Sequence, residues 1–155
     1  MTKKILVVLL AAAMLLLVPV GCQKAPASID GEALYRKMEA LGQFPEMIHR
    51  SGDDVYDYYG IDPAQCRQLV DYAAADGLMT DEFLLAETND PAYAEKVETL
   101  LKDQLSSLAE TYREYLPEEY PKISGARIER NGNYVLVLVG EDVSALYAIY
   151  TDALK

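Results

Sequence analysis

The chain has 155 residues, of which 51% are hydrophobic and 25% charged, and its formal net charge at pH 7 is −11. This acidity excludes nucleic acid as an expected partner, because surfaces that bind phosphate backbones are basic. It also predicts repulsion from anionic lipid headgroups, so a membrane is expected to be reached through a covalent anchor rather than a basic face.

The amino terminus has the composition of an export signal. Lys3 and Lys4 form a basic region, and residues 5–20 carry no charge. This uncharged run is shorter than the roughly 18 apolar residues of a membrane-spanning helix, and Pro19 lies near its end. A cleaved signal peptide over residues 1–21 is therefore predicted.

Residues 17–22 resemble the lipobox of bacterial lipoproteins, with Gly21 directly before Cys22 and with Pro19 in place of the usual leucine. In proteins with a lipobox, the signal is cut before the cysteine, whose thiol carries diacylglycerol. The resemblance therefore implies lipidation of Cys22 and a location on the outer face of the cytoplasmic membrane, where two acyl chains anchor a protein stably. An ordinary secretory signal followed by an unrelated cysteine is the alternative.

After the signal peptide, residues 22–30 are predicted to form a lipidated tether, and residues 31–155 a single domain. As a flexible coil the tether spans only about 17 Å, so the domain is expected to stay close to the bilayer. If Cys22 is lipidated, Cys66 has no intramolecular partner, and the core has to stabilise the domain without a disulfide.

The domain is predicted to begin with two short helices. Apolar residues recur at helical spacing from Gly31 to Leu41, and Gly42 ends the pattern. The second helix is predicted over residues 51–60, which begin with a serine suited to an N-cap and end at a glycine.

Residues 64–76 allow two interpretations. Their helix propensities favour a helix that begins at Pro63, with Asp62 as its N-cap and Gly77 just after its end. The alternative is a strand that pairs with the next element. That element, residues 82–88, is a short apolar run between turn-like flanks and is predicted to be a strand.

A long amphipathic helix is predicted to begin at Pro91 and to end at Leu116, with Asp90 as its N-cap. A hairpin is predicted around Asn131 and Gly132. The reason is that an Asn-Gly pair readily supplies the two positive φ angles of a type I′ turn.

The second strand of this hairpin, residues 134–139, is apolar on both faces. It is therefore expected to lie centrally in the sheet and to be covered on both sides. Apolar residues from Val143 to Leu154 then share one helical face behind the acidic Glu141 and Asp142, which predicts a packed C-terminal helix.

This order of features resembles the DUF4358 lipoprotein family. The most specific matching segments are residues 80–86, 115–117 and 132–136, and the resemblance covers residues 34–154. It implies a lipid-anchored or exported protein, typical of Gram-positive bacteria, from a family without an assigned activity, so no catalytic residue is transferred. In that family the segment matching residues 65–74 looks like a strand paired with the next one, which favours the strand interpretation.

We therefore predict an α+β fold. An antiparallel sheet of about four strands carries a long helix and a C-terminal helix packed on it, preceded by short N-terminal helices. The predicted order after the N-terminal helices is β–β–α–β–β–α.

Two surfaces are candidates for contact with a partner. Tyr56, Tyr58 and Tyr59 are candidate binding residues, because tyrosine offers a flat apolar face and a hydrogen-bonding tip to sugars or cationic peptides. The competing interpretation packs these rings against the domain. The second candidate surface is an exposed face of the sheet.

Four aspartates are candidate metal ligands, because Ca²⁺ takes oxygen ligands: Asp53, Asp54, Asp57 and Asp62. Their spacing matches no EF-hand loop. The competing interpretation is that they cap short helices and face solvent. Apart from Ca²⁺ at this segment, no cofactor is expected.

Residues for familiar catalytic sites are few. His49 is the only histidine, and Cys66 has no His, Lys or second Cys near it in sequence and is expected in the core. The remaining enzymatic alternative is a hydrolase that uses two carboxylates roughly 5–10 Å apart, drawn from Asp53, Asp57, Glu82 and Glu87.

We therefore expect a non-enzymatic binding or accessory module. A subunit or regulator of an envelope membrane complex is the second hypothesis, since a short tether keeps the domain within reach of transmembrane partners. A carboxylate-dependent, glycan-acting hydrolase is the third. The expected partners are the membrane, through diacylglycerol on Cys22, and other envelope proteins.

Overall fold

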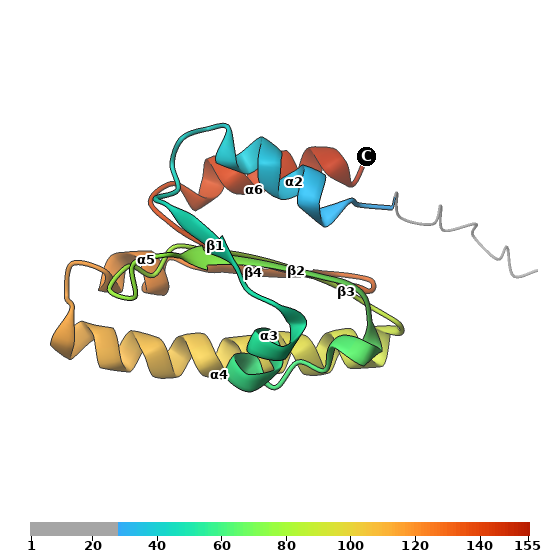
Figure 1. Ribbon diagram of the computed structural model, residues 1–155, viewed down its shortest axis with the longest axis horizontal. Coiled ribbons are helices and arrows are strands. Elements are labelled where there is room, and N and C mark those ends of the chain that lie inside the picture. The colour runs from blue at the N-terminus through green and yellow to red at the C-terminus, as the bar shows by residue number, and fades with distance from the viewer. Residues whose placement is uncertain (1–27) are drawn as a thin grey trace, which may run out of the picture.

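The computed structural model describes residues 28–155, so the predicted signal peptide, Cys22 and most of the predicted tether lie outside the described residues. Residues 28–155 form three layers, with a sheet between two layers of helices (Figure 1). One layer consists of α2 (Gly31–Glu39) and α6 (Val143–Ala153). The other consists of α3 (Gly52–Tyr59), α4 (Pro91–Tyr115) and α5 (Tyr120–Ser124).

The sheet contains five antiparallel strands in the order β1-β2-β3-β5-β4. Their bounds are Met47–His49 for β1, Cys66–Ala74 for β2, Glu82–Thr88 for β3, Arg127–Asn131 for β4 and Tyr134–Val139 for β5. The predicted α+β class is confirmed, as are the long helix and the C-terminal helix. The strand β1 and the helix α5 were not predicted, because three and five residues are too few to show a periodic pattern.

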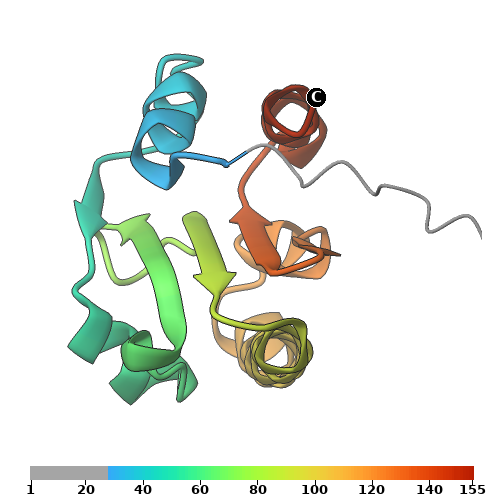
Figure 2. The ribbon, with the colours of Figure 1, turned by 90° about the vertical axis from the view of Figure 1, so that its right-hand side faces the viewer.

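Helices cover both faces of this sheet, as Figure 2 shows with α2 and α6 on one side and α4 on the other. The prediction of an exposed sheet face as a contact surface is therefore wrong. The reason lies in β3 and β5, which are apolar on both faces. Leu84 of β3 packs on the α4 side, whereas Leu85 packs on the α2 side. The strand β5 is central and buried throughout, as predicted.

The segment with two interpretations is a strand from Cys66 to Ala74. Asp62 and Pro63 do start a helical turn, but only the short 3₁₀ turn η2 (Pro63–Gln65), which the Asp62 side chain caps by accepting from the Ala64 N–H. Beyond it, β2 pairs with β3 from Cys66 to Ala73, with one register shift between Cys66 and Gln68. Pairing in the sheet therefore outweighs the helix propensity of this segment.

The predicted hairpin is confirmed, but its turn lies one residue further along. Asn131 pairs with Tyr134, so Gly132 and Asn133 are the two central residues of the turn. Within residues 28–155, only glycines have positive φ, and Gly132 is at 60°. A type I′ turn needs positive φ at both central residues, so that prediction is wrong, and a glycine at the first position fits type II′ instead.

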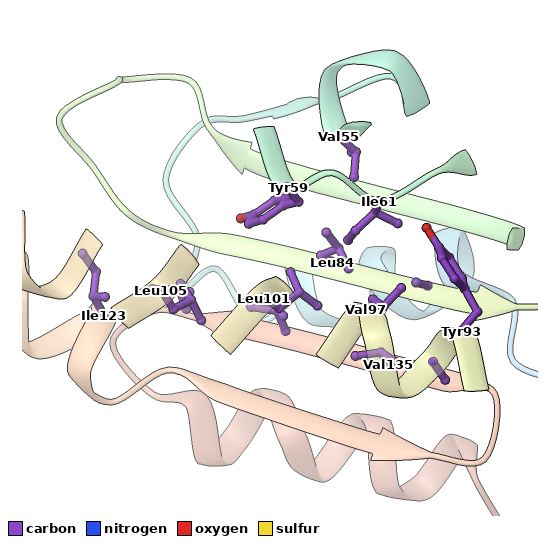
Figure 3. Packing of buried hydrophobic residues seen from close by; sticks show 14 residues of the cluster. Val55, Tyr59, Ile61, Leu84, Tyr93, Val97, Leu101, Leu105, Ile123 and Val135 are labelled. Atoms are coloured by element: carbon purple, nitrogen blue, oxygen red, sulfur yellow. The ribbon is translucent and has the colours of Figure 1, made fainter. Parts of the chain in front are cut away.

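The helix α4 packs along the sheet through a single apolar stripe. Figure 3 shows Val97, Leu101 and Leu105 in a row opposite Leu84 of β3. Complete burial of such a side chain stabilises the fold by roughly 1.5–3 kcal/mol, so the stripe fixes α4 on this face. No helix within residues 28–155 is both long enough and apolar enough to cross a membrane.

The chain enters the domain on the opposite side, beside α2 and α6. Ile29 is buried there, its N–H donates to the Tyr134 hydroxyl at 3.1 Å, and its carbonyl accepts from Gln68. The predicted tether therefore joins the domain on the face of the sheet that does not carry α4.

Candidate functional site

A cavity of about 240 Å³ opens between the sheet and the helices α3, α4 and α5, where β2 ends and β3 begins. This cavity is referred to below as the α4 pocket. Its polar side is formed by Arg50, Thr80, Asp81 and Glu82.

The polar side is backed by a buried ion cluster. The Arg50 guanidinium donates from Nε to Asp71 Oδ2 at 2.6 Å and from Nη2 to Asp71 Oδ1 at 3.1 Å. The same Nη2 donates to Glu82 Oε1 at 2.7 Å, and the Tyr59 hydroxyl donates to that oxygen as well. One guanidinium thus serves two carboxylates, and these four residues are the Arg50 cluster.

Four elements bring the Arg50 cluster together. Arg50 directly follows β1, and its N–H donates to the carbonyl oxygen of Asp71 in β2 at 2.9 Å. Asp71 is paired with Leu84, so its side chain lies on the α4 face of the sheet. Glu82 lies two residues before Leu84 in β3 and therefore shares that face. Tyr59 comes from the last turn of α3.

Burial sets the electrostatics of this cluster. The Asp71 side chain is fully buried, that of Glu82 is 8% exposed and that of Arg50 is 17% exposed. Burial, followed by the charge of Asp71, raises the pKa of Glu82 to about 7. Burial also raises the pKa of Asp71, although Arg50 opposes this shift. The two carboxylates are therefore stabilised by a shared proton or by a further positive charge.

A second ion cluster fixes the loop at the rim of the α4 pocket. Lys122 Nζ of α5 lies 2.9 Å from Asp81 Oδ2 and 3.1 Å from Glu119 Oε1. Glu119 also accepts hydrogen bonds from the N–H of Thr80 at 3.0 Å and from its hydroxyl at 2.9 Å. The loop that leads into β3 is therefore tied to α5.

The rest of the lining is largely apolar. Leu105, Leu108 and Tyr112 of α4 line the pocket together with Ile123 of α5. Tyr58 of α3 also lines it, and its ring centroid lies 5.0 Å from the Arg50 guanidinium carbon, which is cation–π distance. The pocket thus combines aliphatic and aromatic surfaces with buried carboxylates.

The three candidate tyrosines do not form one surface. Tyr59 is only 4% exposed and belongs to the Arg50 cluster, whereas Tyr58 is 43% exposed and lines the α4 pocket. Tyr56 is exposed and does not line that pocket. The rings of Tyr58 and Tyr59 are in edge contact, with centroids 4.7 Å apart, but Tyr59 is turned into the core and Tyr58 towards the pocket.

The four candidate metal ligands do not come together as one group either. Asp54 completes a capping box with Ser51, and Asp62 caps the η2 turn. Asp53 lies in the first turn of α3, and Asp57 borders a shallow hollow beside the α4 pocket, which Asp54 also borders. Across residues 28–155, no three His, Cys, Asp or Glu side chains are grouped as metal ligands. The geometry therefore gives the Ca²⁺ interpretation no support.

Of the four carboxylates considered for a hydrolase, Glu82 lines the α4 pocket and the other three do not. Glu87, at the far end of β3, pairs with Arg67 at 3.3 Å. Asp53 and Asp57 belong to α3. No two of these four carboxylates share the cavity.

The single histidine and the predicted core cysteine lie apart from the α4 pocket. His49 is half exposed, with Nε2 3.8 Å from Glu32 Oε1. Cys66 is half-buried against the α4-side core. Burial, assisted by Asp62, raises the pKa of its thiol to about 11, which is typical of an unreactive cysteine. Cys66 therefore behaves as a packing residue, as expected.

The sequence analysis missed Arg50 and Asp71. A signal for Asp71 was present, because it is the one charged residue between Leu69 and Ala75, and a carboxylate inside a buried strand needs a positive partner. Nothing in the sequence identifies Arg50 as that partner, because the contact depends on β1, which has three residues.

Comparison with known proteins gives a family but no activity. No curated protein and no solved structure matches the chain. The family model described as Domain of unknown function (DUF4358) matches residues 42–140. This range is more than half of the chain, and it contains all five strands and every residue that lines the α4 pocket. The chain therefore belongs to the DUF4358 family, as its sequence features predicted.

Proposed function

We propose that this protein is a non-enzymatic, lipid-anchored extracytoplasmic lipoprotein that binds a small ligand in the α4 pocket. The observation that carries the proposal is the Arg50 cluster, a set of buried charges on the wall of an open cavity. Titratable groups whose pKa values are shifted by burial and by neighbouring charges are concentrated at functional sites.

A contribution to stability does not by itself explain why the charged residues of the Arg50 cluster are buried. Desolvation of buried ions costs several kcal/mol per ion, and apolar residues of similar size are often as stabilising or more so. The same face of the sheet already has an apolar core built from α3, α4 and β5. Charged residues at the edge of that core, next to a cavity, are therefore better explained by binding.

The bonding of the carboxylates favours binding over catalysis. Asp71 is held by two hydrogen bonds from Arg50, and Asp81 is paired with Lys122. Glu82 accepts hydrogen bonds from Arg50 and Tyr59, and burial raises its pKa. A carboxylate-based hydrolase needs two carboxylates placed on either side of the bond to be broken.

The proposed location rests on the amino-terminal sequence, where Gly21 and Cys22 follow an apolar run. The domain is compatible with such an anchor, since Ile29 enters beside α2 and α6, across the sheet from the α4 pocket. An anchor at that point leaves the pocket free to face away from the bilayer.

A fragment screen tests the proposed pocket. The full chain in detergent micelles is screened with small organic fragments by ligand-observed NMR. The same fragments are then tested against Leu108→Trp, which fills the cavity, and against Leu41→Trp, which adds the same ring on an exposed site outside it. Fragments lost in Leu108→Trp alone support the proposal. Binding that persists in both variants, or a screen without hits, contradicts it.

A further inference from the structure

The α4 pocket carries more negative than positive groups. Its wall and the residues bonded to that wall include two basic side chains, Arg50 and Lys122, and four carboxylates, Asp71, Asp81, Glu82 and Glu119. Each basic side chain already contacts two of the carboxylates. A cationic ligand would be attracted by the excess negative charge, whereas an anion would be repelled.

Glu82 is the best-placed partner for such a ligand. Its side chain lines the pocket and is 8% exposed. The hydrogen bonds from Arg50 and Tyr59 both fall on Oε1, and Glu82 also makes a side-chain hydrogen bond to Asp71, which needs a proton between the two carboxylates. An ammonium group in the pocket would take the place of that proton. Hydrogen bonds between a cation and a carboxylate are about twice as strong as neutral ones. The pKa of Glu82 is raised because burial and the charge of Asp71 outweigh the charge of Arg50, so a second positive group beside Glu82 would be favourable.

The rest of the lining suits an organic cation rather than a bare ion. Tyr58 already contacts one cation, the Arg50 guanidinium, through its ring face, and Tyr112 of α4 also lines the pocket. Tyrosine rings attract ammonium and guanidinium groups. Leu105 and Leu108 offer apolar contact to a hydrocarbon group attached to the charge.

We infer that the α4 pocket binds a small organic amine, with its ammonium group at Glu82 and its hydrocarbon part against Leu105 and Leu108. This inference rests on the proposed function and names the chemical class of its ligand. A cavity of about 240 Å³ accepts a ring with a short chain.

Three probes of nearly the same shape test the charge of the ligand. They are 2-phenylethylamine, which is cationic at neutral pH, 2-phenylethanol, which is neutral, and 3-phenylpropionate, which is anionic. Dissociation constants are measured by NMR titration of the full chain in detergent micelles. The amine is expected to bind about tenfold more tightly than the alcohol, and the propionate is expected to bind most weakly.

Variants of the protein test whether Glu82 causes the preference for the amine over the alcohol. Glu82→Gln keeps the shape of the side chain and removes its charge, so the preference for the amine over the alcohol is expected to disappear. The matched control is Glu87→Gln in the same strand, since Glu87 pairs with Arg67 and does not line the pocket. This control is expected to keep the tenfold preference, and Leu108→Trp is expected to abolish binding of all three probes.

The results separate this inference from the proposed function. Equal binding of the three probes that Leu108→Trp abolishes overturns the assignment to an amine and leaves the pocket as a ligand site. A preference for the amine that survives in Glu82→Gln overturns the assignment to Glu82. Binding that Leu108→Trp does not change, or no binding by any probe, overturns both proposals.

Discussion

The Nη2 atom of Arg50 lies 2.7 Å from Oε1 of Glu82, and both side chains are largely buried. Because Arg50 also binds Asp71, its removal leaves two buried carboxylates without a counter-charge. We predict that Arg50→Met lowers the free energy of unfolding, measured by urea denaturation, by about 3–5 kcal/mol. This loss is large because the desolvated carboxylates remain in the core.

The control for Arg50 is Arg67→Met. Arg67 also pairs with a strand carboxylate, Glu87, but its side chain is 58% exposed. Exposed pairs contribute at most about 1 kcal/mol, so the loss in this variant should be small. Equal losses in the two variants would show that burial of the Arg50 cluster has no special energetic role.

A dependence of stability on pH follows from Glu82. Burial first, and Asp71 second, raise its pKa in the folded protein to about 7, from an ordinary value of 4.5. The folded state therefore holds this proton more tightly than the unfolded chain. The resulting stabilisation is fully present below the unfolded pKa of 4.5 and is lost as the pH rises through about 7. Asp71, whose pKa is also raised by burial, acts in the same direction.

We predict that the wild-type protein loses stability relative to Glu82→Gln between about pH 5 and pH 8. Urea denaturation of both proteins across this range gives the difference in their free energies of unfolding. Taking the difference cancels the contributions of groups that the two proteins share. Two parallel stability curves would mean that Glu82 titrates as an ordinary carboxylate.

The start of α2 lies so close to β2 that it requires a glycine. A Cβ atom on Gly31 would lie 2.9 Å from Val70 Cγ2 and 3.0 Å from Gln68 Oε1. We predict that Gly31→Ala destabilises the fold by about 1–3 kcal/mol, because α2 has to move away from the sheet. Gly77→Ala is the control, since a Cβ there meets nothing within 4 Å. Thermal unfolding of both variants compares them, and a Gly31→Ala variant as stable as Gly77→Ala would show that α2 moves freely.

Membrane attachment is tested by separate cysteine variants. The proposed lipid on Cys22 predicts that Cys22→Ala blocks cleavage by the lipoprotein peptidase or releases the protein into the medium. Cys66→Ala removes the other thiol of the chain, which lies in the domain, and should leave the protein in the membrane fraction. Detergent-phase partitioning measures both. Unchanged partitioning of Cys22→Ala would refute the anchor.

Much of the fold could be predicted from local signals. Asp90 and Pro91 start α4 as expected, because an N-cap and a proline at the first position act within a few residues. The hairpin was predictable for the same reason, although Gly132 occupies the first central position of its turn rather than the second. Predictions that rest on local sequence signals are therefore confirmed by the structure, with small differences in the positions of the elements.

The site was harder to predict because its contacts are distant in sequence. Arg50 and Glu82 meet only because β1, β2 and β3 are neighbours in the sheet. The chemistry of tyrosine predicts Tyr59 as a binding residue, but the helical period of α3 turns it into the core and leaves Tyr56 outside. Residue type alone makes Glu82 a candidate catalytic carboxylate, whereas its contacts with Arg50 and Asp71 depend on the register of the strands.

An NMR chemical-shift map with 2-phenylethylamine tests ligand binding at Glu82 most directly. The amide signals of the full chain are followed during a titration, with Glu82→Gln measured in parallel. Binding in the α4 pocket predicts that the largest shifts fall on residues 79–82 and 105–112, and that they shrink in the variant. Shifts that cluster on α2 and α6 instead, or that are identical in the variant, would contradict it.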